Sequence, residues 1–442
     1  MAKRSRSTPA VVLFLFIAAL SLLVGTAGAV PVAAFTSNVT TGAAPLTVEF
    51  TDSSSGSPTG WAWYFGDETY NGTWTNQTAL SGSDPGWAER VDHTSVVLPD
   101  GSIVIMGGGD TGYLGDVWRS TDNGTTWEEV TTSGPIWSPR QGHTSVALPD
   151  GSIVIMGGNS AGLNNNVWRS TDNGATWTEQ TAGAEWSARH AHTTVALPDG
   201  SIVLMGGSDN SDSLKNDVWL STNNGTTWTS QTASAEWSAR STHSSVVMPD
   251  GSIILMGGYD SGGSKNDVWL STNNGTTWTN ITPSGGNLWP ARNRHTSVVM
   301  PDGSIILMGG YGTNRLNDAW RSTDNGTTWT NITPSGGNLW PARNRHTSVA
   351  LPDGSIILMG GSDGGYSYLN DTWRLDTAGS NAQNPTHTYT EPGTYTVALQ
   401  AYNDDGYNAT RKVGYITVTA PVAPTAAFTA NRTSGTAPLA IQ

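Results

Sequence analysis

Six arginines recur along the chain, each three residues before a histidine, and they are the residues best suited to bind a charged ligand. A guanidinium group carries a fork of N–H donors that fits a carboxylate or a sulfate, so a ring of them would bind an acidic glycan. The alternative is that each arginine pairs with an aspartate of its own repeat, because a residue that recurs in every repeat usually serves the architecture. The arginines are Arg90, Arg140, Arg189, Arg240, Arg292 and Arg343, and the aspartates are Asp116, Asp217, Asp267, Asp318 and Asp371.

Tyrosines in the variable loops are a second set of candidate ligand-binding residues: Tyr113, Tyr259, Tyr311, Tyr366 and Tyr368. Exposed aromatic rings can stack on sugar rings. Packing of the same rings against neighbouring loops is the alternative, and the sequence leaves both open.

The sequence gives little support for disulfides, metal binding or catalysis. The chain has no cysteine, which excludes disulfides, thiolate metal sites and cysteine nucleophiles. The recurring histidines come one per repeat rather than converging in twos or threes, so we predict no metal site. A glycosidase needs a distinct acid and nucleophile, whereas these repeats are nearly identical. We therefore predict no catalytic residue and no cofactor.

The elements that must position these residues come from an internal repeat. Its histidines recur every 49 to 52 residues, at His93, His143, His192, His243, His295 and His346. A period near 50 with four strand-like segments is typical of a β-propeller blade. In the first unit the expected strands are His93–Leu98 (a), Ser102–Met106 (b), Val117-Trp118 (c) and Thr126-Trp127 (d).

Tryptophans count six such units. Three recur in every unit, at strand c, at strand d and in the connection to the next strand a, and we expect their rings to be core. The first landmark is a strand d at Trp74, and the last is a strand c at Trp373 with no strand d after it. We therefore expect the N-terminal strand to complete the last blade, which protects an exposed edge and brings the two ends of the propeller together.

The direction of the strands alternates, so the connections divide between two faces of the disc. The a–b and c–d turns share one face and are short and repetitive. The b–c and d–a loops share the other face and vary more, which makes that face the better candidate for binding.

The repeat resembles two known families. The Gly-Gly pair after strand b and the Asn-Asp-Val-Trp of strand c, at Asn216–Trp219 and Asn266–Trp269, are similar to the kelch repeat. The pattern Ser-x-Asp-x-Gly-x-x-Trp, at Ser120–Trp127, Ser170–Trp177 and Ser322–Trp329, resembles the Asp-box of sialidase-like propellers. That resemblance implies that Asp122, Asp172 and Asp324 stabilise turns away from any catalytic site.

The segments on either side of the repeat resemble the two halves of one polycystic-kidney-disease (PKD) domain, an immunoglobulin-like β-sandwich. Trp63-Tyr64-Phe65-Gly66-Asp67 and Pro385-Thr386-His387-Thr388-Tyr389 carry this resemblance. The expected fold is thus all-β, a six-bladed propeller (69–376) inserted between PKD-like parts at 30–68 and 377–420. Residues 421–442 look like the start of a second, truncated PKD-like domain.

The N-terminus and the charge suggest where the protein works. A basic start, an apolar run from Val11 to Val24 and Ala27-Gly28-Ala29 predict a cleaved signal peptide over residues 1–29. An uncleaved anchor is the alternative. We expect a secreted or cell-surface protein that is monomeric in this region and does not enter the membrane beyond that segment.

The function that these features favour is a non-enzymatic binding or adhesion module on a PKD-like stalk, contacting extracellular protein or glycan. The formal net charge of −14 argues against nucleic acid as a partner. The alternatives are a sialidase-like glycosidase and a passive structural component of the cell envelope.

Overall fold

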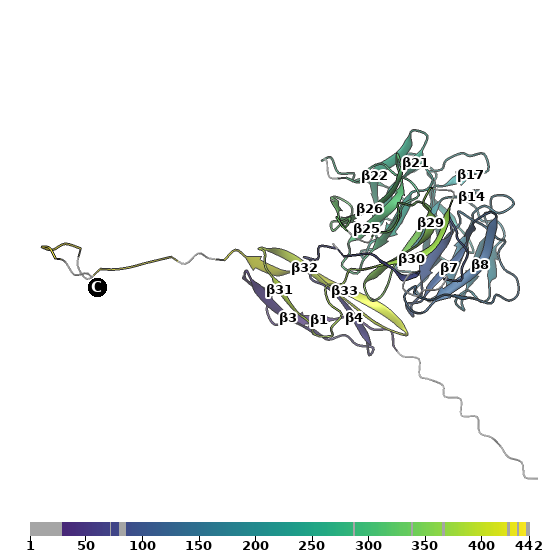
Figure 1. Ribbon diagram of the computed structural model, residues 1–442. Helices are drawn as coiled ribbons and strands as arrows, with labels where there is room; N and C mark the ends of the chain where they lie inside the picture. Colours follow the sequence, from purple (N-terminus) through teal and green to yellow (C-terminus); the bar gives the residue numbers. More distant parts are fainter. Residues whose placement is uncertain are drawn as a thin grey trace, which may run out of the picture.

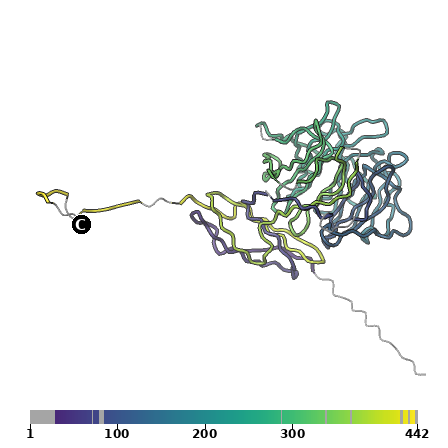
Figure 2. The backbone as a smooth tube through the Cα atoms, in the orientation of Figure 1, coloured from purple at the N-terminus to yellow at the C-terminus, as the bar shows by residue number. Residues whose placement is uncertain are grey.

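The computed structural model describes residues 29–70, 72–78, 85–285, 288–336, 339–364, 367–421, 425–430 and 433–438. It contains a ring of β-sheets and a β-sandwich, joined by two adjacent chain crossings (Figures 1 and 2). The predicted signal peptide lies outside the described residues except for Ala29, and so does Tyr366. Within the described ranges no helix is long and apolar enough to cross a membrane.

Six four-stranded antiparallel sheets form the blades of the propeller. Blades 1 and 2 are β6 (Thr94–Val97), β7 (Ile103–Gly109), β8 (Tyr113–Ser120), β9 (Glu128–Glu129) and β10 (Thr144–Ala147), β11 (Ile153–Met156), β12 (Val167–Ser170), β13 (Thr178–Thr181). Blades 3 and 4 are β15 (Thr193–Ala196), β16 (Ile202–Met205), β18 (Val218–Ser221), β19 (Thr229–Thr232) and β20 (Ser244–Val247), β21 (Ile253–Asp260), β22 (Gly263–Ser271), β23 (Thr279–Asn280). Blades 5 and 6 are β24 (Thr296–Val299), β25 (Ile305–Tyr311), β26 (Arg315–Ser322), β27 (Thr330–Asn331) and β28 (Thr347–Ala350), β29 (Ser355–Ser362), β30 (Tyr368–Asp376), β5 (Thr75–Asn76). A small extra pair, β14 (Arg189–His190) and β17 (Ser208–Asp209), extends blade 3.

The blades pack through their second strands, which are buried on both faces. Ile103, Val104, Ile105 and Met106 have no exposed surface, and the equivalent residues of the other blades are the same. Such continuous apolar runs suit a sheet covered on both sides. A left-handed glycine, Gly101 in the first blade (φ +80°), closes the turn that delivers each of these strands.

Two of the three tryptophans in each unit are core residues, as predicted. Trp137 and Trp177, for example, meet edge to face with ring centroids 6.0 Å apart. The strand-c tryptophans differ from the prediction, because they are only half-buried. In most blades the indole N–H is held by the aspartate two residues earlier, as Trp118 Nε1 is by Asp116 (2.7 Å). Strand d of the first blade also begins two residues later than predicted, at Glu128, so Trp127 precedes the strand.

The ring is closed by a segment from its own beginning. Strand β5 pairs with β30 through Trp373↔Asn76 and Arg374↔Thr75, which is the arrangement that the phase of the repeat predicts. Trp74, fully buried, packs on Trp340 with ring centroids 6.1 Å apart. The two ends of the propeller are therefore adjacent, as insertion into another domain requires.

The sandwich is built from both flanks. One sheet has the order β1-β3-β31 and the other β2-β33-β32-β4, so each sheet mixes strands from before and after the propeller. Trp63 at its centre has no exposed surface and contacts Phe35, with centroids 5.2 Å apart. The strands are β1 (Phe35–Ser37), β2 (Thr41–Ala43), β3 (Leu46–Asp52), β4 (Gly60–Tyr64), β31 (Thr386–Tyr389), β32 (Gly393–Asn403) and β33 (Gly406–Thr419).

The sandwich is fixed to one face of the propeller, at the a–b turns. Gln400 Nε2 donates to the carbonyl of Pro352 (2.6 Å) in blade 6. Tyr64, also buried, lies within hydrogen-bond reach of the Gly354 carbonyl (3.4 Å). The opposite face, with the b–c and d–a loops, is free of these contacts.

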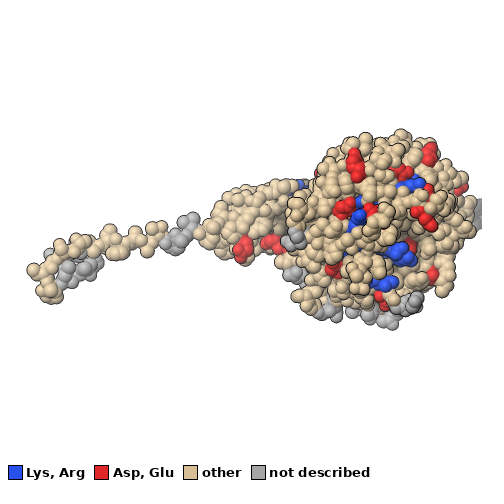
Figure 3. All heavy atoms as spheres, turned by 90° about the horizontal axis from the view of Figure 1, so that it is seen from above, with Lys and Arg blue, Asp and Glu red and all other residues tan. Residues whose placement is uncertain are grey.

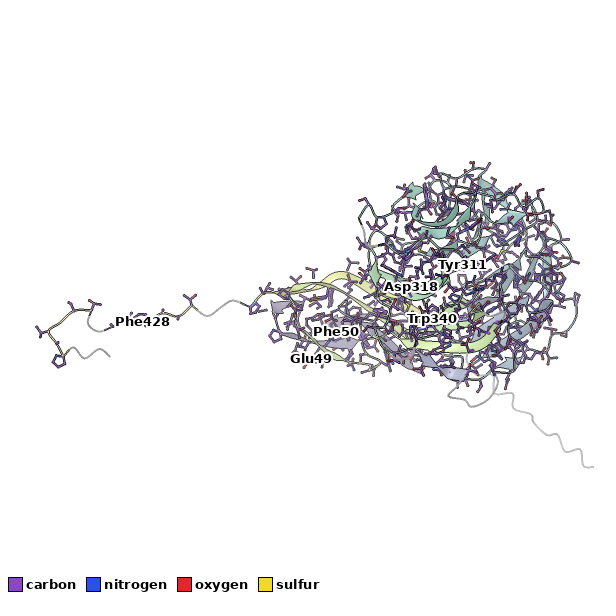
Figure 4. All side chains as sticks on the ribbon, turned by 45° about the horizontal axis from the view of Figure 1, so that its top comes forward. Glu49, Phe50, Tyr311, Asp318, Trp340 and Phe428 are labelled. Atoms are coloured by element: carbon purple, nitrogen blue, oxygen red, sulfur yellow. The ribbon has the colours of Figure 1, made fainter. Side chains whose placement is uncertain are left out.

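The described parts of the C-terminal tail extend away from the sandwich (Figures 1 and 4). They contain no strand, and Phe428 is 94% exposed. The interpretation of residues 421–442 as the start of a second PKD-like domain stays a prediction.

Candidate functional site

The candidate site is the propeller face that carries the b–c and d–a loops, named here the loop face; the face of the a–b and c–d turns is the turn face. On the loop face a pocket of about 300 Å³ lies over the central channel. A side groove of about 790 Å³ shares Arg294 and Arg345 with this pocket and is lined by residues of blades 5, 6 and 1. Figure 3 shows basic side chains interspersed with acidic ones over the propeller.

The floor of the central pocket is a ring of six histidines, one from each blade. Nε2 of each lies 2.8 to 3.2 Å from a Thr or Ser hydroxyl of the preceding blade. Burial, followed by the nearby arginine of the same blade, lowers the pKa of His143, His243 and His346 to about 3. The ring is therefore neutral and serves to join neighbouring blades. Within the described residues there is no group that could hold a metal ion.

Above the histidines, the residue before each one adopts a left-handed backbone conformation, with φ between 52° and 61°. Each of these residues donates its N–H to the carbonyl of its counterpart in the preceding blade, and Asp92 N to Arg345 O (3.1 Å) closes the circle. These six residues line the mouth of the pocket. They do not repeat: they are Asp92, Gly142, Ala191, Thr242, Arg294 and Arg345.

The six arginines predicted to bind ligand are not available to one, which corrects that interpretation. Arg90, Arg140, Arg189, Arg240, Arg292 and Arg343 have no exposed surface. Five form two-pronged bonds with the aspartates that the alternative named; Arg189, for example, donates to Asp217 Oδ1 (2.7 Å) and Oδ2 (2.8 Å). Each also donates to a glycine carbonyl of its own blade, such as Gly206. They tie the strand-a connection to strands b and c, so their role is architectural.

Blade 2 is the exception in this set. Arg140 meets Asn166 in place of an aspartate, through one bond of 2.9 Å. Burial without a carboxylate partner lowers the pKa of Arg140 to about 10. Trp168 Nε1, whose counterparts donate to the aspartate, has no partner among the described residues.

The loop tyrosines lie where the sequence placed them. Tyr113, Tyr259 and Tyr311 are 41%, 49% and 38% exposed at the b–c hairpins of blades 1, 4 and 5. Figure 4 labels Tyr311 on the propeller. Tyr368 lines the side groove, whereas Tyr366 falls outside the described residues. Three aromatic rings are thus available on the loop face.

The Asp-box aspartates hold their own turns. Asp122 Oδ1 accepts from Thr126 N (2.8 Å) and Oδ2 from Thr126 Oγ1 (2.6 Å). Asp172 and Asp324 do the same, and Asn223 takes the role in blade 3. These residues lie at the c–d turns, on the face opposite the pocket.

Sequence reasoning missed three residues of the loop face: Arg294, Arg345 and Arg315. The first two stand directly before ring histidines in the two copies of Pro-Ala-Arg-Asn-Arg-His, and Arg315 opens β26. The signal that could have found them is a departure from the repeat. A position that varies while its surroundings recur is not needed by the blade.

Three family models match parts of the chain. A KLHDC2/KLHL20/DRC7 Kelch-repeats domain matches residues 150–361, a DUF6242 beta propeller domain matches residues 31–180, and a PKD domain matches residues 359–418. The DUF6242 match covers strands of the sandwich and the first two blades, and the PKD match begins in blade 6, whereas the Kelch match lies within the propeller.

One curated relative is an F-box/kelch-repeat protein of Arabidopsis thaliana, 32% identical over 93 residues. The similarity spans 20% of this chain and 19% of the relative. The matched length corresponds to about two of the repeats of 49 to 52 residues, so the similarity carries no information on most of either protein.

Proposed function

Because the chain combines a Kelch-repeat β-propeller with a PKD domain, we propose that it is an exported, non-enzymatic module that binds an extracellular protein or carbohydrate on its loop face. Propellers host many activities, so the proposal depends on the site rather than on the fold.

The observation that carries the proposal is the difference between the two faces. On the turn face, a pocket of about 700 Å³ is lined by the a–b turns and by Asp405, Gly406 and Tyr407 of the sandwich. On the loop face, two pockets are lined by propeller residues alone. One face is therefore engaged by the host domain, while the other offers pockets and exposed rings to a partner.

The test is binding of residues 30–442 to a glycan array and to a panel of extracellular proteins. Replacing Tyr113, Tyr259 and Tyr311 together by Ser should weaken the binding that is found. Tyr407→Ser is the matched control, because Tyr407 has a similar exposure (39%) but belongs to the sandwich and lines the pocket on the turn face. Equal loss in both variants would contradict the assignment to the loop face.

Two further outcomes would overturn the proposal. Hydrolysis of a labelled glycoside would make the protein a glycosidase. No binding to glycans or proteins would favour the passive structural role. Export has its own test: protein purified from the culture medium should begin at Val30, whereas an uncleaved anchor would keep the intact N-terminus in the membrane fraction.

A further inference from the structure

The side groove gathers three arginines from two neighbouring blades. Arg294 and Arg345 project from the left-handed backbone ring, and Arg315 comes from the start of β26. The chain has 21 basic residues and a net charge of −14, so three arginines in one groove are a marked local concentration. The volume of about 790 Å³ is in the range of small-molecule sites.

These arginines lack the partners that the structural arginines have. Arg345 forms an ion pair with Asp92 (3.3 Å), but Arg294 and Arg315 pair with no carboxylate of the described residues. Their Nε atoms are buried and, within the described ranges, have no hydrogen-bond partner. Burial, followed by the charge of Arg345, lowers the pKa of Arg294. An anion bound between them would offset this unfavourable crowding of like charge.

Two carboxylates near the groove offset part of its positive charge, but neither forms an ion pair with Arg294 or Arg315. Asp110 lines its far side, but Asp110 Oδ1 accepts from Gly112 N in its own turn (2.8 Å). Asp92 is engaged with Arg345. Five of the six fully buried arginines of the blades have two-pronged aspartate bonds. Arg294 and Arg315 differ from these five, because neither pairs with a carboxylate of the described residues.

The side-chain oxygen of a neighbouring asparagine also has no hydrogen-bond partner among the described residues. In blade 5, Asn293 Nδ2 donates to Ser264 Oγ (2.8 Å), and Ser264 lies opposite Tyr259 in the hairpin of blade 4. At the equivalent place Arg315 lies opposite Tyr311. The corresponding Asn344, only 4% exposed, therefore lacks a serine partner, and its Oδ1 has no described partner.

We propose that this groove binds a sugar that carries a carboxylate or sulfate, with Arg294 and Arg315 on the anion. The Asn344 amide is placed to bond a sugar hydroxyl. The guanidinium carbon of Arg315 lies 6.0 Å from the centroid of the Tyr311 ring, and the exposed part of that ring offers a stacking surface beside the anion. This inference deepens the proposed function and rests on it, since it names the ligand class of the loop face. It assigns to a non-repeating cluster the chemistry that the sequence suggested for the recurring arginines.

The experiment is calorimetric titration of residues 30–442 with four probes: a galacturonic acid tetramer, a sulfated oligosaccharide of similar length, a neutral galactose tetramer and a glutamate hexapeptide. We expect one of the two anionic saccharides to bind and the neutral one not to. The comparison of uronate with sulfate identifies the anionic group. Equal binding of the acidic peptide would overturn the assignment to a sugar.

Variants then locate the site. Arg294→Gln and Arg315→Gln should each weaken anionic saccharide binding by roughly 10- to 100-fold, because each removes a charge-assisted hydrogen bond. Lys265→Gln is the matched control: it removes one positive charge from the same face, where Lys265 pairs with Asp260, and should change affinity less than about twofold. Melting temperatures should not fall in the two arginine variants, because they relieve like-charge crowding. Arg294→Lys, which keeps the charge and loses the fork, covers the case in which Arg294→Gln fails to fold.

The outcomes separate the two proposals. Saccharide or protein binding that is unaffected by Arg294→Gln and Arg315→Gln would leave the proposed function standing and overturn this inference. Absence of any ligand in both experiments would overturn both.

Discussion

Thr347 Oγ1 lies 3.0 Å from Nε2 of His93, a residue 254 positions earlier in the chain. The same hydroxyl–imidazole contact joins each of the other five pairs of neighbouring blades. The last blade is therefore joined to the first by the same contact as any two consecutive blades. The innermost layer of the propeller thus consists of six neutral histidines in a closed circle, with a second circle of backbone hydrogen bonds above it.

Acid should destabilise the fold through this ring. Burial lowers the folded-state pKa of all six histidines, to about 3 for His143, whereas the unfolded value is about 6.5. The unfolded chain therefore binds more protons below pH 6.5, and the free energy of unfolding falls as the pH drops. Each histidine contributes a slope of about 1.4 kcal/mol per pH unit once the pH is well below 6.5.

Urea unfolding at pH 7.5, 6 and 5 measures this slope. Histidine NMR signals give a direct check, because the six ring imidazoles of the folded protein should not titrate between pH 8 and 5. Titration of the ring near pH 6.5 would show that it is solvated, contrary to the structure.

Asn166→Asp should stabilise blade 2. It gives Arg140 the two-pronged partner that Arg189 has in Asp217, and it gives Trp168 Nε1 the acceptor that Trp118 has in Asp116. The expected gain is about 1–3 kcal/mol in the free energy of unfolding. The gain should disappear at a pH low enough to protonate the new carboxylate, which is the control; an equal gain at low pH would point to another cause.

Removing a partner from the paired blades should have the opposite effect. Asp217→Ala leaves the buried Arg189 uncompensated and should cost about 3–5 kcal/mol. Asp217→Asn reproduces the natural pair of blade 2 and should cost less. Equal losses in the two variants, measured by urea unfolding, would mean that the charge of Asp217 and not its shape holds Arg189.

The closing strand should depend on one tryptophan. Strand β5 has only two residues, and Trp74 beside it is fully buried against Trp340. Trp74→Ala should cost about 3–5 kcal/mol and speed hydrogen exchange along β30. Trp177→Ala, the equivalent change within the continuous blades, should leave exchange in β30 unchanged. Protection of β30 that survives Trp74→Ala would show that the ring closes without this anchor.

Substitution of an Asp-box aspartate should destabilise the fold less than loss of an aspartate that pairs with a buried arginine. Asp172→Ala removes the two bonds to Thr176 and should lower the free energy of unfolding by about 1–2 kcal/mol. Asp172→Asn should be nearly neutral, because Asn223 already holds the same turn in blade 3. Saccharide binding should be unchanged in both variants, since the boxes lie on the turn face; a loss of binding would contradict that placement.

Much of the fold was predictable because the blade sequence recurs six times. The spacing of His93 and its counterparts gave the blades, and the phase between Trp74 and Trp373 gave the closure. The arginine ring was harder, since a recurring Arg with a recurring Asp fits both a buried pair and an exposed site. Only the burial of Arg189 and its geometry to Asp217 decide between them.

The side groove could not be predicted from the repeat, because its arginines stand at positions that differ from one blade to the next. Arg294 and Arg345 come together because both belong to the circle of left-handed residues before the histidines, and Arg315 joins them from the start of β26. That Arg294 and Arg315 lack a carboxylate partner among the described residues is a property of three-dimensional packing. The sequence offers a pointer in the variable residue before each ring histidine, but not the cluster.

Because each sheet of the sandwich combines strands from before and after the propeller, the sandwich cannot finish folding until the propeller has been synthesised. Leu46 in β3 pairs with Tyr389 in β31, so the first half of the host leaves the ribosome long before its partner strands. At about 5–20 residues per second the delay is on the order of 15–70 s. Throughout that interval β3 has an open edge and Trp63 lacks half of its covering. The propeller is therefore the first domain that can finish folding. Its closure brings the two halves of the sandwich close to each other.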